Sequence, residues 1–276
     1  PGYFSLPNSR HQFRDWKRGG HGVVDLRRSI SQSCDVYYYR LAVDMGVDRM
    51  HDYLAQFGLG EKTGIDLAGE SSGLLPSRDW KQRRWNKPWY PGETVIAGIG
   101  QGYHLTTPLQ LAVATAMLAN GGKRIEPRLV QAVRDPLAHA WQPLPGRARK
   151  PVAITPAHLA VVREGMMDVM RPGGTAAASA AGTPYAIAGK TGTAQVVGIK
   201  QGARYDASRL ARQHRDHALF IAYAPTENPT IAVAVMVENG SSGSGTAAPI
   251  ARAVFDYYLT GKRPGDMKLE ASDAAD

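Results

Sequence analysis

The sequence has 276 residues, of which 43% are apolar and 21% charged, a composition that excludes a disordered or fibrous chain and allows one large domain. The formal net charge is +9 at pH 7, but the basic residues lie on separate segments, which argues against nucleic-acid binding. A single cysteine, Cys34, excludes an internal disulfide framework. No apolar run could span a bilayer and no signal-peptide pattern opens the chain, so any membrane anchor is expected upstream of Pro1.

Helical patterns begin after an irregular opening segment, residues 1–22. Asp25 can cap a short first helix. An apolar pattern from Tyr37 to Met45 predicts a second helix, which the glycine at position 46 stops, and Asp48–Phe57 predicts a third. The N-terminal part is therefore expected to be helical.

The middle of the chain alternates between loops and helices. Gly60–Gly102 is rich in Gly, Pro, Trp and Arg, which predicts long loops with little regular structure. Thr107–Asn120 and Thr155–Met170 each carry a proline in the first turn and an apolar face, and both are expected to be core helices.

The pattern changes from helical to extended in the last third of the chain. Tyr185–Val197 reads as a strand that contains glycines, and His217–Ala224 with Thr230–Val237 reads as a hairpin. Thr246–Leu259 predicts a closing amphipathic helix. Helices followed by an antiparallel sheet and a final helix indicate an α+β domain.

The segment Lys190-Thr191-Gly192-Thr193 combines a cation, hydroxyls and a glycine within the predicted strand. Such a strand can pair with an extended peptide, while Lys190 attracts a carboxylate and a backbone N–H near Thr193 stabilises an oxyanion. The motif is short, and a second copy, Lys62-Thr63-Gly64, lies in a turn-rich loop and is assigned a structural role. A strand-edge lysine without function is the alternative for Lys190.

Polar residues of two kinds gather near the break between the first two predicted helices. Ser33 and Asp35 can face a cleft with a hydroxyl and a carboxylate, or can simply cap the following helix. Asp15, His21 and Cys34 offer the oxygen, nitrogen and sulfur ligands that zinc accepts. The alternatives are a buried apolar cysteine and an ordinary hydrogen bond between the loop residues, and these roles are the more common.

Together these segments resemble the motif set of penicillin-recognising serine acyltransferases, S-x-x-K, S-x-N and K-[TS]-G. Ser33 to Asp35 matches the second motif and Lys190 to Gly192 the third. The likeness continues through loop motifs in the order of the class B, elongation-type penicillin-binding proteins: Arg14–Trp16, Gly20–Gly22, Phe57–Gly60, Thr63–Leu67 and Gly98–Gly102.

The resemblance implies a penicillin-binding, serine β-lactamase-like transpeptidase fold, with a central antiparallel sheet flanked by helices. Residues 1–262 would form this domain without its N-terminal S-x-x-K part, and residues 263–276 a flexible tail. It also implies a peptidoglycan D,D-transpeptidase that cross-links stem peptides during elongation through a serine acyl-enzyme, is a target of β-lactams, and works at the periplasmic face of the inner membrane. A SEDS-family glycosyltransferase and elongation scaffold proteins would be its partners.

For the residues, the resemblance implies that Ser33 relays a proton toward the leaving group and that Lys190 polarises Ser33 and the substrate carboxylate. Asp35 stands where many relatives have Asn, and Thr191 and Thr193, on either side of the strand glycine at position 192, hold the peptide. Some family members also bind a structural zinc through two Asp, a His and a Cys. The ligands here would be Asp15, His21 and Cys34, with a second aspartate upstream of Pro1, and no organic cofactor is expected.

One departure from the family pattern is large, because no S-x-x-K occurs in these residues. The nucleophile is therefore expected upstream, in an N-terminal part that this chain lacks. Two alternatives stay open: a serine β-lactamase or D,D-carboxypeptidase, and a non-catalytic peptide-binding or scaffold domain of the same fold. Turnover of acylated penicillin would favour the former, and failure to form a penicillin adduct would favour the latter.

Overall fold

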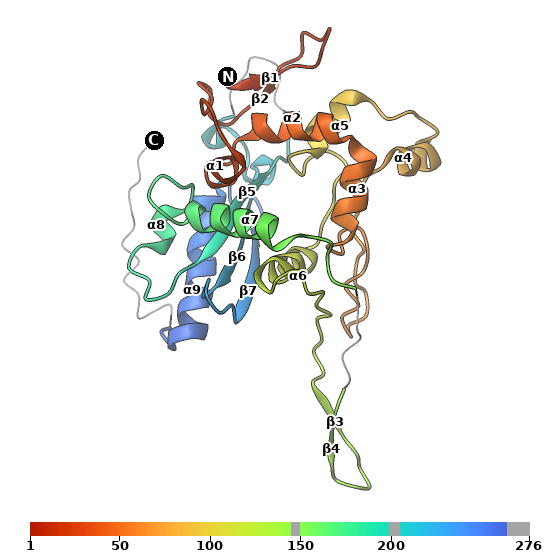
Figure 1. The fold of residues 1–276 in the computed structure, drawn as a ribbon, viewed down its shortest axis with the longest axis vertical. Coiled ribbons are helices and arrows are strands. Elements are labelled where there is room, and N and C mark those ends of the chain that lie inside the picture. The colour runs from red at the N-terminus through yellow and green to blue at the C-terminus, as the bar shows by residue number, and fades with distance from the viewer. Residues whose placement is uncertain (145–149, 199–204, 264–276) are drawn as a thin grey trace.

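The structure is a computed structural model that describes residues 1–144, 150–198 and 205–263. Helices gather around a small sheet, and a narrow hairpin projects from the body (Figure 1). The expected tail, residues 263–276, lies outside the described residues apart from its first residue.

The described part of the chain contains an antiparallel sheet of three strands in the order β5-β6-β7. Its members are β5 (Ala188–Ala194), β6 (His217–Ala224) and β7 (Ile231–Val237). The α+β class, the hairpin and the closing helix are confirmed, although β5 is shorter than the extended pattern that surrounds it. Its register sets Lys190 opposite Ile221.

The main core forms where this sheet packs against helices α6, α7 and α9, visible around the sheet in Figure 1. Phe220 and Tyr223 of β6 and Phe255 of α9 are almost completely buried there, and Val169 of α7 joins them. Complete burial of one apolar side chain of this size stabilises the folded state by about 1.5–3 kcal/mol relative to leaving it exposed. The strand that carries Lys190 is therefore anchored to a rigid layer.

The helices expected near the N-terminus are present, and the caps explain their ends. They are α1 (Leu26–Ser31), α2 (Asp35–Met45) and α3 (Val47–Ala55). Asp25 caps α1 by accepting a hydrogen bond from the backbone of Arg28, and Gly46 follows α2 with φ +75°. The two later helices, α6 (Pro108–Ala119) and α7 (Pro156–Val169), begin after capping Thr107 and Thr155.

The prediction of long loops over Gly60–Gly102 is wrong where α4 (Arg78–Trp85) and α5 (Pro91–Ala97) form, whereas residues 61–73 contain no helix or strand, as expected. Ser77 caps α4, and Glu93 completes a capping box at the start of α5. Trp89, one of the tryptophans that suggested loops, instead lies beside the buried ammonium of Lys81 together with Tyr90 and Tyr103. Tertiary packing of this kind overrides local propensity.

The remaining elements are short. They are β1 (Tyr3–Phe4) paired with β2 (Phe13–Arg14), the projecting hairpin of β3 (Ala132–Arg134) and β4 (Trp141–Pro143), α8 (Ala177–Ala180), 3₁₀ turns at Ala207–Arg209 and Arg212–His214, a π-helical turn at Gly243–Ala247, and the helix that this turn leads into, α9 (Ala248–Thr260). Within the described ranges, every helix is too short or too polar to cross a membrane.

Candidate active site

Ser33 and Lys190 meet, although 157 positions separate them in the chain. Lys190 Nζ donates a hydrogen bond to Ser33 Oγ at 2.7 Å and a second to the carbonyl of Thr191 at 2.9 Å. Ser33 occupies the turn between α1 and α2 with φ +53°, and Lys190 is the third residue of β5. Helix α7 contacts both α1 and β5, so one helix holds the two halves of the site together.

The helix-capping alternative for Ser33 and Asp35 is excluded. Helix α2 begins after Cys34 and has no capping side chain of its own. Instead, Asp15 reaches in from the opening segment and accepts a hydrogen bond from the backbone of Val36 at 3.2 Å. This carboxylate satisfies an N–H of the first turn that has no acceptor within the helix. The Ser33 hydroxyl is therefore not needed as a cap and interacts with Lys190.

Trp16 clamps the turn that carries Ser33. Its indole N–H donates to the carbonyl oxygens of Ser33 at 2.9 Å and Gln32 at 3.1 Å, and its backbone N–H donates to Asp35 at 3.2 Å. The left-handed backbone at Ser33 is unusual for a residue with a side chain and requires such support. No physical signal in the sequence marks this role, since Trp16 entered only as part of a family loop motif.

The two charged groups of the site have shifted pKa values. Burial lowers the pKa of Lys190 to about 8, and the attraction of Asp35 opposes this shift. Burial raises the pKa of Asp35 to about 6, helped by the nearby carboxylate of Asp15 and opposed by the N–H of Trp16 and the charge of Lys190. At pH 7 the site therefore holds a lysine cation, which loses its charge as the pH rises through about 8, and an aspartate anion, which loses its charge as the pH falls through about 6.

Two contacts fix the neighbouring residues of β5. Thr191 and Thr175 share a hydrogen bond between their hydroxyl oxygens at 2.9 Å. The side-chain amide of Gln101 donates to the carbonyl of Thr193 at 2.8 Å. A side chain on Gly192 would crowd Leu219, with a Cβ–Cβ distance of 3.3 Å. Sequence reasoning missed Thr175, which no motif marks, while Gln101 carried a signal as part of the Gly98–Gly102 motif.

The three possible metal ligands lie together next to this site. The donor atoms of Asp15, His21 and Cys34 are buried and all lie within 4.8 Å of one another. Asp15 and His21 share a hydrogen bond of 3.0 Å, so the ordinary loop contact exists as well. The other imidazole nitrogen of His21 lies 3.1 Å from the side-chain oxygen of Gln32.

The second K-T-G sequence has the structural role assigned to it. The backbone N–H groups of Thr63 and Gly64 donate to the carboxylate of Glu70, which closes the loop on itself. Lys62 thus lies in an irregular loop and not in a strand.

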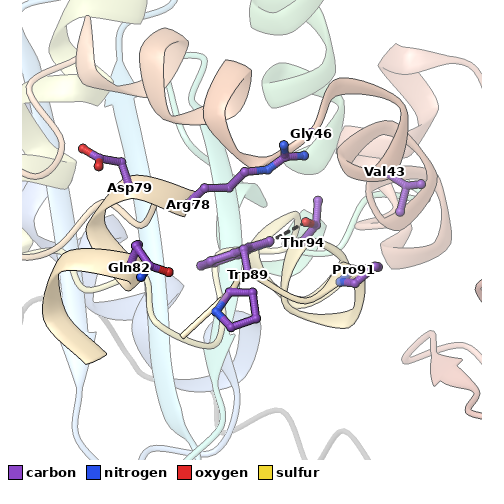
Figure 2. Close-up of a pocket in the computed structure, with 9 residues that line it drawn as sticks. Val43, Gly46, Arg78, Asp79, Gln82, Trp89, Pro91 and Thr94 are labelled. Atoms are coloured by element: carbon purple, nitrogen blue, oxygen red, sulfur yellow. Dashed lines mark hydrogen bonds between the residues drawn. The ribbon is translucent and has the colours of Figure 1, made fainter. Parts of the chain in front are cut away.

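Two cavities lie elsewhere on the molecule. Figure 2 shows one of about 600 Å³, between the end of α2 and helices α4 and α5, where the indole of Trp89 donates to Thr94. The other lies along α7, beside Arg163, and is closed by Gly121 and Ile154. Neither is lined by Ser33 or Lys190, which meet through their hydrogen bond of 2.7 Å.

The chain belongs to the penicillin-binding protein transpeptidase domain family, whose model matches residues 3–256. This membership confirms the fold that the motifs implied. Among curated relatives, the peptidoglycan D,D-transpeptidase MrdA of Acinetobacter baumannii is 44% identical over 97% of the chain, and MrdA of Escherichia coli is 40% identical over 98%. The chain spans about two fifths of the length of these relatives, 39% and 42%.

Solved structures agree with this assignment. Pseudomonas aeruginosa PBP2 in complex with WCK 5153 has a TM-score of 0.82 and 44% identity, covering 99% of this chain and 57% of that one. PBP2 of Helicobacter pylori, in its complex with MreC, has a TM-score of 0.78 and 32% identity, covering 95% and 45%. The resemblance to the penicillin-binding protein 2 group is thereby confirmed.

Proposed function

We propose that this chain forms most of the catalytic domain of a peptidoglycan D,D-transpeptidase that cross-links stem peptides during cell elongation and is acylated by β-lactams. The hydrogen bond between Lys190 and Ser33 carries the proposal, because it joins the family's second and third motifs. The identity to MrdA enzymes over nearly the whole chain supports the same activity.

The reaction requires a serine nucleophile, which we propose lies in polypeptide outside residues 1–276, since these hold no S-x-x-K. Its oxygen attacks the carbonyl of the penultimate D-alanine, the C–N bond breaks, and the serine proton passes to the leaving nitrogen. Ser33 is suited to relay that proton because its hydroxyl both accepts from Lys190 and can donate. An amine of a second stem peptide then attacks the ester, and the serine recovers its proton.

The open side of β5 is proposed to hold the donor peptide. Strand β6 pairs with one side of β5, and in the described residues no strand pairs with the other. An extended peptide can add itself there, with the outward N–H of Thr193 directed at the developing oxyanion. Lys190, at 2.7 Å from Ser33, supplies the positive charge for the terminal carboxylate of the substrate.

We also propose a structural zinc ion bound by Asp15, His21 and Cys34. The donor set fits, because one oxygen, one nitrogen and one sulfur converge within 4.8 Å and the contact with Gln32 orients the imidazole of His21. A fourth ligand, an aspartate by resemblance, would come from outside these residues. Bound there, zinc would tie the opening segment to the turn of Ser33 and would supply no chemistry to the reaction.

The setting follows from the proposed activity. Peptidoglycan cross-linking takes place outside the cytoplasm, so we propose the periplasmic face of the inner membrane as the location, with an anchor outside this chain. The H. pylori relative forms a complex with MreC, and another relative 33% identical belongs to a peptidoglycan synthase complex. Elongation scaffold proteins and a SEDS-family glycosyltransferase are accordingly the proposed partners.

Labelling with a fluorescent penicillin tests the activity. A full-length polypeptide that contains this chain should form a covalent adduct, which unlabelled penicillin prevents and which persists for many minutes. Rapid loss of the label by hydrolysis would instead indicate a β-lactamase or carboxypeptidase. The absence of any adduct from folded protein would leave the non-catalytic scaffold domain as the better function.

A further inference from the structure

Two carbonyl groups on β5 are occupied by side-chain donors. Lys190 Nζ donates to the carbonyl of Thr191, and Gln101 Nε2 donates to that of Thr193. Carbonyl groups of residues two positions apart in a strand point to the same side. Because Gln101 comes from outside the sheet and β6 pairs with the opposite side of β5, both carbonyls face the unpaired side.

The donor from Gln101 is held in place by its backbone. Gln101 lies in the tight turn after α5, between Gly100 at φ +75° and Gly102 at φ +76°, and its own N–H donates to the carbonyl of Ile96 at 3.2 Å. The side chain is the part of this residue that can rotate away, since it is half-buried and bonds to β5 through one nitrogen. The contact is thus both well positioned and reversible.

A peptide that pairs with the free side of β5 needs the same carbonyl. In an antiparallel pair, a hydrogen-bonded residue exchanges both of its bonds with the residue opposite. The substrate residue whose carbonyl accepts from the N–H of Thr193 therefore donates its own N–H to the carbonyl of Thr193. That acceptor is the one that Gln101 occupies.

We propose that Gln101 is a placeholder for the substrate: its side-chain amide satisfies the carbonyl of Thr193 in the free site and is displaced by the amide N–H of the residue whose carbonyl is attacked. This inference rests on the proposed transpeptidase function and concerns the selection of its donor substrate. A ligand with an N–H at that position restores the lost hydrogen bond. A ligand with an ester oxygen there cannot, and leaves a carbonyl without a donor.

The magnitude follows from the value of one hydrogen bond. A neutral hydrogen bond contributes about 0.5–1.5 kcal/mol net, and a factor of ten in affinity corresponds to about 1.4 kcal/mol. Removing the placeholder should therefore improve substrate binding about two- to tenfold. We expect this improvement in KM and not in kcat, because the hydrogen bond from Gln101 to the carbonyl of Thr193 exists only in the free site.

The test compares wild type with Gln101→Met in a full-length polypeptide that contains this chain. Release of D-alanine is measured from a peptide ending in D-alanyl-D-alanine, and from the analogue whose ester oxygen replaces the N–H of the first D-alanine. We expect the variant to lower KM about two- to tenfold for both ligands, with kcat unchanged. We also expect wild type to bind the peptide more tightly than its ester analogue. Gln82→Met, at an exposed glutamine of α4, is the matched control and should leave KM unchanged.

The outcomes separate the inference from the function on which it rests. A raised or unchanged KM in Gln101→Met, with wild type active, overturns the placeholder and makes Gln101 a residue that merely pins β5. Failure of wild type to release D-alanine or to form a penicillin adduct overturns the function itself. If the variant unfolds, NMR of wild type decides: the Gln101 side-chain signals should move to free-amide positions on saturation with the peptide, and signals that stay in place overturn the inference.

Discussion

Lys190 and Ser33 share a hydrogen bond of 2.7 Å, by which a strand in the last third of the chain reaches a turn near its beginning. We expect Lys190→Met, in a full-length polypeptide, to slow acylation by benzylpenicillin by roughly 10²–10⁴, the range for loss of a positioned proton-transfer group. The rate of adduct formation measures this. Lys62→Met is the matched control, because Lys62 begins the K-T-G sequence of the structural loop. Equal loss in both variants would contradict the assignment.

The pH dependence of acylation should report the same lysine. Burial lowers the pKa of Lys190 to about 8, so its ammonium is present below that pH and is lost as the pH rises through it. Attraction of a ligand carboxylate depends on the ammonium, and the second-order acylation rate should fall tenfold per pH unit above about 8. In Lys190→Arg the guanidinium keeps its charge, so whatever rate remains should lack this alkaline fall. An identical fall in both proteins would assign it to another group.

The hydrogen bond between the hydroxyls of Thr175 and Thr191 predicts a smaller effect on acylation. Thr175→Val removes the partner of the Thr191 hydroxyl, which lies at 2.9 Å, while keeping the side-chain shape. Loss of one such bond costs about 0.5–1.5 kcal/mol, so acylation efficiency should fall about two- to tenfold. Thr183→Val is the control, because Thr183 bonds the carbonyl of Ala180 away from the site. A similar fall in the control would mean that the effect is one of general stability.

Much of the fold follows from local signals in the sequence. The parts that could not be predicted in this way share one cause. The capping residue Asp25 and the first-turn proline at position 108, with the period of apolar residues, indicate where helices begin, and these predictions hold. Helices α4 and α5 were missed although Ser77 and Glu93 are local signals of their starts, because the Gly, Pro, Trp and Arg content of the segment predicted loops. The packing of aromatic rings around Lys81 leaves no local pattern. The same limit applies to the site: motifs indicated Ser33 and Lys190, whereas Trp16 and Thr175 act through contacts across the fold.

The proposed zinc site predicts a measurable stoichiometry. A full-length polypeptide purified without chelators should contain about one zinc per chain by elemental analysis, and Cys34→Ser should lose most of it, because the thiolate is the strongest ligand of the set. Chelation should lower the melting temperature of wild type and leave that of the variant unchanged, since a metal that binds only the folded state stabilises it. Wild type without zinc, or with a melting temperature that chelators do not change, would contradict the site.

Lys81 and Glu93 provide a prediction on stability alone. Lys81 is 2% exposed, forms an ion pair with Glu93 and lies 4.3 Å from the centre of the Tyr90 ring. Glu93 also accepts from the backbone N–H of Tyr90 at 2.8 Å, so the pair fixes the start of α5.

Removing one partner leaves the other charge poorly solvated, and Lys81→Met should lower the free energy of unfolding by about 3–5 kcal/mol, measured by urea denaturation. The double variant Lys81→Met, Glu93→Gln removes both charges and should recover a large part of this loss, because a neutral amide can still accept from Tyr90. If the double variant is as unstable as the sum of the two single variants, the charges are independent, and the buried pair does not stabilise α5 as a unit.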